Sequence, residues 1–137
     1  MTVAAEVLAV VAAAAALAGC GLDVQSADLF QVTRTGQGQK LTLLVNDAGT
    51  IACNGGKPKS LPDRLLLQAR DLSTNLNKDA KPRLRVPASP RSVFSYTVKV
   101  QNGTFTFPDT AARARKELAR LELFVVQAAA DPCGISA

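Results

Sequence analysis

The body of the chain opens with apolar and polar residues in alternation, which is the pattern of half-buried antiparallel strands. Between Asp28 and Cys53 this pattern predicts three strands, separated by glycine-containing turns at 36–39 and 47–49. Counting outward from these turns sets apolar residues opposite one another on a single face. The expected pairs are Phe30 with Val45, Val32 with Leu43, Thr35 with Lys40, Val45 with Ile51 and Leu43 with Cys53.

Helical periodicity replaces the alternation after residue 60. Ser60 is the expected N-cap, with Pro62 and Asp63 in the first turn. The apolar residues that follow predict an amphipathic helix of about four turns. They are Leu65, Leu66, Ala69, Leu72 and Leu76. Prolines between Asn77 and Ser92 then predict a long connection, with a short extended piece at Leu84–Val86.

The rest of the chain predicts one more hairpin and one more helix. A turn at Asn102-Gly103 would set Phe105 opposite Val100 and Phe107 opposite Val98, on the face shared with Phe94 and Tyr96. A helix capped by Asp109 or Thr110 is expected over 111–130. Its expected buried stripe is Ala114, Leu118, Leu121, Val125 and Ala128. The fold class is therefore α+β, an antiparallel sheet of about five strands (order βββαββα) with two helices packed on one face.

The first twenty residues have a different character. Val7–Leu17 is an apolar run, shorter than the roughly 20 residues that span a bilayer as a helix and typical of the centre of an export signal. It ends in Leu17-Ala18-Gly19-Cys20, which resembles the lipobox of bacterial lipoproteins. The resemblance implies that Cys20 carries a diacylglycerol with palmitate-type chains. The segment before the run departs from usual signals, because it lacks Lys and Arg and contains Glu6.

The lipoprotein resemblance divides the chain into three parts. Residues 1–19 would be removed as a signal peptide, 20–27 would form a tether, and 28–137 would fold as a single domain. The expected location is the extracytoplasmic face of the cell membrane, with the lipid as anchor. An uncleaved N-terminal anchor and a buried Ala-rich helix of a cytosolic domain stay open as alternatives.

The composition excludes several kinds of chemistry. The 137 residues include no His, which removes His-based acid–base catalysis, Ser-His and Cys-His nucleophiles, and His-containing zinc sites. Neither a Ser-x-x-Lys motif nor a carboxylate pair on one helix face is present. We therefore expect no enzyme, no cofactor and no metal site. Once Cys20 is acylated, Cys53 and Cys133 remain, and such a pair outside the cytoplasm predicts a disulfide, whereas a metal pair would have an incomplete ligand set.

Two basic segments are candidate binding sites. Loop 55–60 contains Lys57, Lys59 and Ser60 at the expected start of a helix, where backbone amides and the helix dipole can hold a small anion; a turn followed by an ordinary N-cap is the alternative. Segment 78–91 is a candidate contact for anionic headgroups or wall polymers, against the alternative of a solvated loop. Its basic residues are Lys78, Lys81, Arg83, Arg85 and Arg91.

The charge balance alone would also suit a polyanion. The chain has 16 basic and 11 acidic residues, one of which, Glu6, lies in the expected signal peptide. Aromatic residues are hardly interleaved with the basic ones, and an exported protein does not meet nucleic acid, so we expect no nucleic-acid partner.

A second resemblance covers the middle of the chain. Leu41–Leu72, with a strand, a cysteine, a Gly/Pro loop and an Ala/Leu helix, is similar to the middle of the actinobacterial subtilisin-inhibitor family. That family has an α+β fold and inserts a disulfide-braced reactive loop into a protease cleft. The resemblance implies that segment 78–91 supplies the loop, although the family's second cysteine pair is absent here.

The sequence thus predicts a membrane-anchored extracytoplasmic lipoprotein with a small binding or structural domain. It names neither a ligand nor a protein partner. A protease inhibitor of the subtilisin-inhibitor type and a small-anion binding module are the alternatives.

Overall fold

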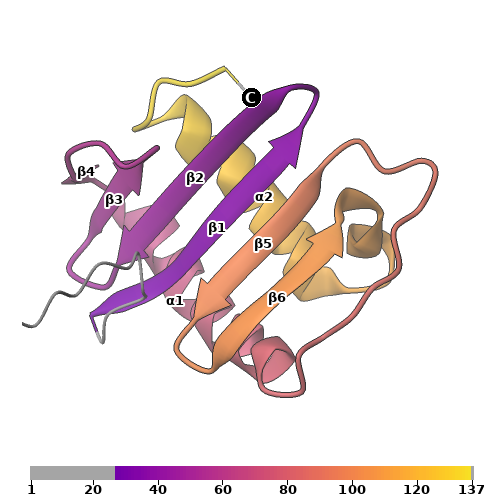
Figure 1. The fold of residues 1–137 in the computed structure, drawn as a ribbon. Helices are drawn as coiled ribbons and strands as arrows, with labels where there is room; N and C mark the ends of the chain where they lie inside the picture. Colours follow the sequence, from indigo (N-terminus) through magenta and orange to yellow (C-terminus); the bar gives the residue numbers. More distant parts are fainter. Residues whose placement is uncertain (1–26, 137) are drawn as a thin grey trace, which may run out of the picture.

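The computed structural model describes residues 27–136, so the predicted signal peptide, Cys20 and nearly all of the tether lie outside the described residues. Within this range the chain forms one open antiparallel sheet in the strand order β4-β3-β2-β1-β5-β6. Both helices cover the same face of the sheet (Figure 1). The elements are β1 (Asp28–Gly36), β2 (Gln39–Asn46), β3 (Thr50–Cys53), β4 (Lys59–Ser60), α1 (Asp63–Ala80), β5 (Ser95–Val100), β6 (Gly103–Pro108), the short 3₁₀ helix η1 (Asp109–Arg113) and α2 (Lys116–Ala130).

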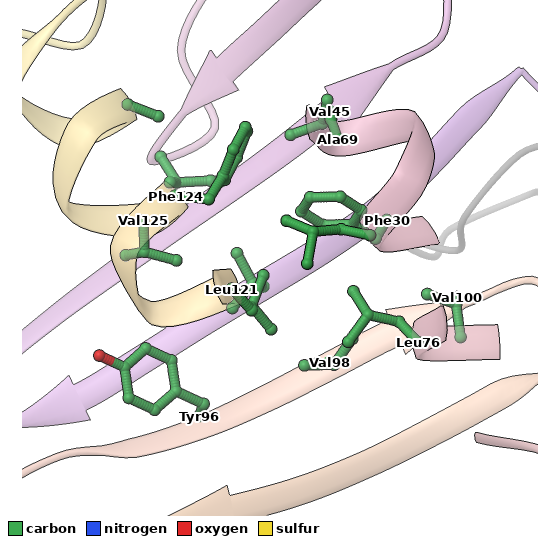
Figure 2. Close-up of a cluster of buried hydrophobic side chains, with 14 of the residues drawn as sticks. Phe30, Val45, Ala69, Leu76, Tyr96, Val98, Val100, Leu121, Phe124 and Val125 are labelled. Carbon is green, nitrogen blue, oxygen red and sulfur yellow. The ribbon is translucent and has the colours of Figure 1, made fainter. Parts of the chain in front are cut away.

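The predicted fold class is confirmed, with one strand more than expected. The sixth strand, β4, is only two residues long and pairs with β3 at the edge of the sheet. The core fills the layer between the sheet and the helices, where side chains from β1, β2, β5, α1 and α2 meet (Figure 2). At its centre the rings of Phe30 and Phe124 pack edge to face with centroids 5.6 Å apart, a favoured aromatic geometry.

The first two hairpins have the predicted register. Val32 pairs with Leu43, Phe30 with Val45, and Val45 with Ile51. Residues of this parity are buried on the helix side, while Thr33 and Thr42 of the opposite parity bond to each other across the strands at 3.3 Å. Side-chain alternation and glycine-containing turns therefore determine this half of the sheet together.

The prediction for the last hairpin was wrong by two residues. Val98 pairs with Phe105 and Tyr96 with Phe107, so the turn is at 101–102 and Gly103 already belongs to β6. A shift of two residues keeps every side chain on its face, so the apolar pattern cannot distinguish the two registers. Helix α1 favours the observed turn, because the amide of Asn102 donates to Asn77 Oδ1 at 2.9 Å.

Three expectations about the helices need correction. Ser60 is not the N-cap of α1, because it lies in β4 and the helix begins at Asp63 after Pro62. The helix also continues beyond Leu76 to Ala80, into the segment expected to be irregular. The last helix is interrupted between η1 and α2, and Ala114 is consequently exposed rather than part of the buried stripe.

The sheet has two ends with different surroundings. We call the end where β1 begins the tether end; it includes the turns 47–49 and 101–102. Helix α1 crosses this end, since Arg70 Nε donates to Asp47 Oδ1 at 2.7 Å and Ser73 Oγ donates to Leu29 O at 3.2 Å. We call the opposite end, with the β1–β2 turn, the far end. None of the helices within 27–136 is both long and apolar enough to span a bilayer.

Candidate functional site

The two cysteines expected to pair form a disulfide at the far end. Cys53 at the end of β3 is bonded to Cys133 after α2, with the two Cα atoms 5.8 Å apart. Backbone bonds hold the segment around Cys133 as well: Cys133 N donates to Ala128 O at 3.1 Å, and Ile135 N donates to Ala129 O at 2.7 Å. The C-terminal segment is therefore fixed beside the last residue of β3.

The structure does not place loop 55–60 at the start of a helix. Lys59 and Ser60 lie in β4, where they pair with Ile51 and Thr50 of β3. The ammonium of Lys59 donates to Pro132 O at 3.4 Å, and Lys57 is exposed. Helix α1 begins three residues after Ser60, so Lys57, Lys59 and Ser60 precede the helix and Ser60 does not cap it.

The five basic residues of segment 78–91 do not form one surface. Lys78 and Lys81 lie at the C-terminal end of α1, near the 101–102 turn and so at the tether end. The chain then runs parallel to β6, with a bridge between Arg85 and Thr106. It reaches the far end of β6, where the hydroxyls of Ser92 and Thr110 are 3.3 Å apart and Arg91 directly precedes Ser92. Figure 1 shows the outer course of this loop. Between these ends, Arg83 and Arg85 line an open groove of about 590 Å³ against Thr104 and Thr106.

The connecting loop (81–94) between α1 and β5 is anchored at both ends. At its start, Leu84 N donates to Asp79 O at 2.9 Å, and the half-buried side chains of Leu84 and Val86 pack on the core. At its end, the carboxylate of Asp109 accepts bonds from the amides of Val93 and Phe94 at 3.1 and 3.2 Å. The predicted extended piece at Leu84–Val86 is thus present, as the part of the loop that bridges β6.

The exposed part of this loop has internal bonds too. Pro87, Ala88, Pro90 and Arg91 are exposed. Ser89 lies among them and accepts through its carbonyl from Ser92 N at 2.9 Å and through its hydroxyl from Arg91 N at 3.2 Å. Hydrogen bonds and apolar anchors therefore brace this loop where the subtilisin-inhibitor resemblance would lead one to expect a disulfide. No sequence signal marked Asp109 for this role, because the bonds join residues 15 and 16 positions apart.

Two acidic side chains in the helical layer have raised pKa values; Asp79 is buried and Glu122 is half-buried. Burial raises the pKa of Asp79 to about 6, with nearby Glu117 acting in the same direction and Arg115, at 3.5 Å, opposing it. Burial raises the pKa of Glu122 to about 7, with a smaller contribution from Asp109. Neither carboxyl belongs to a metal-ligand cluster of the described residues. Their effect is on stability, considered below.

Comparison with known proteins adds no assignment. No protein-family model, no curated protein and no solved structure matches this chain.

Proposed function

We propose that this chain is an exported lipoprotein, in which an acylated Cys20 holds a small binding domain on the extracytoplasmic face of a bacterial membrane. The disulfide between Cys53 and Cys133 carries the proposal, because such bonds persist in oxidising compartments and are rare in the cytosol. It leaves Cys20 as the one unpaired cysteine, at the position that the lipobox resemblance assigns to the lipid.

The tether would keep the domain close to the bilayer. Strand β1 begins at Asp28, and the residues between Cys20 and Asp28 span at most about 29 Å when fully extended. The tether end of the sheet would therefore face the membrane, with Lys78 and Lys81 beside it. Each basic residue near an anionic bilayer surface contributes about 1 kcal/mol. The far end and the exposed part of the connecting loop would face away from the membrane, where a partner can reach them.

Membrane fractionation tests the anchor directly. The full chain is expressed in a bacterium that processes lipoproteins, either unchanged or as Cys20→Ser or Cys133→Ser. We expect the unchanged chain and Cys133→Ser in the membrane fraction and Cys20→Ser outside it, because only the last loses the acylated sulfur. Equal membrane association and gel mobility of Cys20→Ser and the unchanged chain would disprove the proposal.

The braced connecting loop favours protease inhibition as a second candidate function. An inhibitor of this kind must present an exposed segment whose conformation is fixed before binding, since preorganisation lowers the entropic cost of association. The segment 87–91 is exposed, and its flanks are held by Asp109 and by the bridge of Arg85 to β6.

Incubation with subtilisin tests this candidate. We expect the protein to slow peptide hydrolysis, and the variant Asp109→Ala to inhibit more weakly and to be cleaved within 87–91, because the loop has lost its C-terminal anchor. Asp63→Asn, which changes an acid in the first turn of α1, is the matched control and should inhibit as the unchanged protein does. Undiminished subtilisin activity with the unchanged protein would eliminate inhibition.

A further inference from the structure

One charged side chain in the described domain is buried without an opposite charge. Arg34 is on the helix side of β1, in line with Phe30 and Val32, and only 5% of its surface is exposed. It lies at the far end of the sheet, paired with Leu41 of β2 and Tyr96 of β5. A guanidinium stays ionised in proteins, so this position holds a permanent positive charge.

No ion pair of Arg34 is present among the residues that the structure describes. Its guanidinium carbon is 4.6 Å from the centroid of the Phe94 ring, a favourable cation–π contact. Burial and the charge of Glu122 raise the pKa of Tyr96, although Arg34 acts in the opposite sense, so the phenol is neutral near pH 7. Among residues 27–136, the ion pairs of Asp47, Asp71, Asp79 and Glu117 are with other arginines.

Leaving a buried cation without an anion is costly. The free-energy cost of removing one ion from water exceeds the gain from one cation–π contact. A leucine or methionine would fill the same place on the core face of β1 without that cost. A bound anionic ligand would offset this cost and would account for the charge at this position.

Arg34 lines a cavity that could admit such a ligand. The cavity has a volume of about 250 Å³ and opens at the far end. Lys40 also borders the cavity, but it has the parity of Thr42, so its side chain leaves β2 on the opposite face of the sheet from Arg34. Within the described part of the chain, the cavity wall contains no acidic residue. The remaining lining residues are polar (Gln39, Asn54 and Ser136) or apolar (Leu41 and Ile135).

The walls of the cavity are held in place before any ligand binds. Asn54 directly follows Cys53, and Ile135 lies two residues after Cys133, so the disulfide joins the two sides. Asn54 N donates to Thr42 O at 2.8 Å, and Asn54 Oδ1 accepts from Thr42 N at 2.8 Å. Among residues 27–136, the Asn54 side chain bonds only through Oδ1, so its NH₂ group can donate to a ligand.

We propose that this cavity binds a small organic carboxylate, whose oxygens pair with the Arg34 guanidinium. Arginine presents two parallel donors that match a carboxylate, and the apolar walls at Leu41 and Ile135 would contact a short hydrocarbon group. The volume lies just below the range of about 300–1,000 Å³ for drug-sized ligands, which limits the ligand to a small molecule or the C-terminus of a peptide.

Amide chemical shifts of the full chain in detergent provide the test. The probes are N-acetylalanine, its uncharged analogue N-acetylalaninamide, and inorganic phosphate, all at constant ionic strength. We expect N-acetylalanine to shift the amides of Lys40, Leu41, Asn54 and Ile135 and the Arg34 Nε–H resonance, saturating at millimolar concentration. The uncharged analogue should have no effect, and phosphate should bind more weakly, since it makes no use of the apolar walls.

Variants separate binding from folding. Arg34→Leu should abolish saturable binding while leaving the protein as stable as before or more stable, because an uncompensated buried charge is removed. Lys81→Gln at the tether end is the control without effect. If Arg34→Leu does not fold, the Arg34 Nε–H resonance of the unchanged protein tests the contact, because it should shift when N-acetylalanine is added. Equal affinity for phosphate, or no saturable shift with N-acetylalanine, would overturn the proposal.

Discussion

The disulfide offers the most quantitative prediction about stability. Cys53 and Cys133 are 80 residues apart, and a bond between them removes the entropy of a loop of that length from the unfolded chain. The loop-entropy relation gives about 15 cal/mol/K, or about 4.5 kcal/mol at 25 °C. A domain of this size has a total stability of about 5–15 kcal/mol, so replacing both cysteines by alanine should remove a large part of it.

Urea denaturation followed by far-UV circular dichroism measures the effect. With a denaturant dependence of about 2 kcal/mol/M, a loss of 4.5 kcal/mol lowers the midpoint by about 2 M. The unchanged protein in reducing buffer should behave like the double variant, and the double variant should not respond to reductant. A midpoint shift below about 0.5 M would refute the reasoning, because the bond would then constrain little of the unfolded chain.

Three further predictions test local features of the fold. The free energy of unfolding should fall by on the order of 1–3 kcal/mol between about pH 5 and about pH 8. The pKa values of Asp79 (about 6) and Glu122 (about 7) in the folded state are above their unfolded values near 4, so protonation of these carboxyls stabilises the folded state. This stabilisation is lost as the pH rises through the folded-state pKa values. Urea melts of Asp79→Asn and Glu122→Gln should show a flatter profile, and a rise in stability with pH would contradict this assignment. Gly36→Ala should destabilise the protein by more than about 2 kcal/mol, because the added Cβ would clash with Val93 O. In the control Gly38→Ala the added Cβ meets no atom within 4 Å, so the variant should lose only about 1 kcal/mol for its left-handed backbone. Equal melting temperatures of the two variants would contradict the close approach at Gly36. Removing the exposed ion pair between Arg120 and Asp71 should cost less than about 1 kcal/mol in a double-mutant cycle, and a larger coupling would show that this pair is not an ordinary surface contact.

Local rules predicted the first half of the sheet because two independent signals agree there. The turn glycines set where the chain reverses, and the alternation of Phe30, Val32 and Leu43 sets the face. In the last hairpin the alternation was correct but the turn position was not. The contact that favours the observed turn joins Asn102 to Asn77 of α1, and a local reading of the sequence has no access to it.

The same division applies to the candidate sites. The pairing of Cys53 with Cys133 was predictable by counting, since two thiols remain after Cys20. Arg34 shares the parity of Phe30 and Val32, and that was the available signal for a buried guanidinium. What could not be predicted is that its neighbours would be Tyr96 of β5 and Phe94, just before that strand, rather than an acid. Likewise, Asp109 was expected to cap a helix, but its carboxylate accepts bonds from the loop across from it.

The intact mass of the protein extracted from membranes, before and after reduction and alkylation, tests the central claim most directly. The account predicts a chain that begins at Cys20 and carries a diacylglycerol, with no alkylation before reduction and two alkylated cysteines after it. A chain that begins at Met1, carries no lipid and has a free thiol at Cys20 would contradict it.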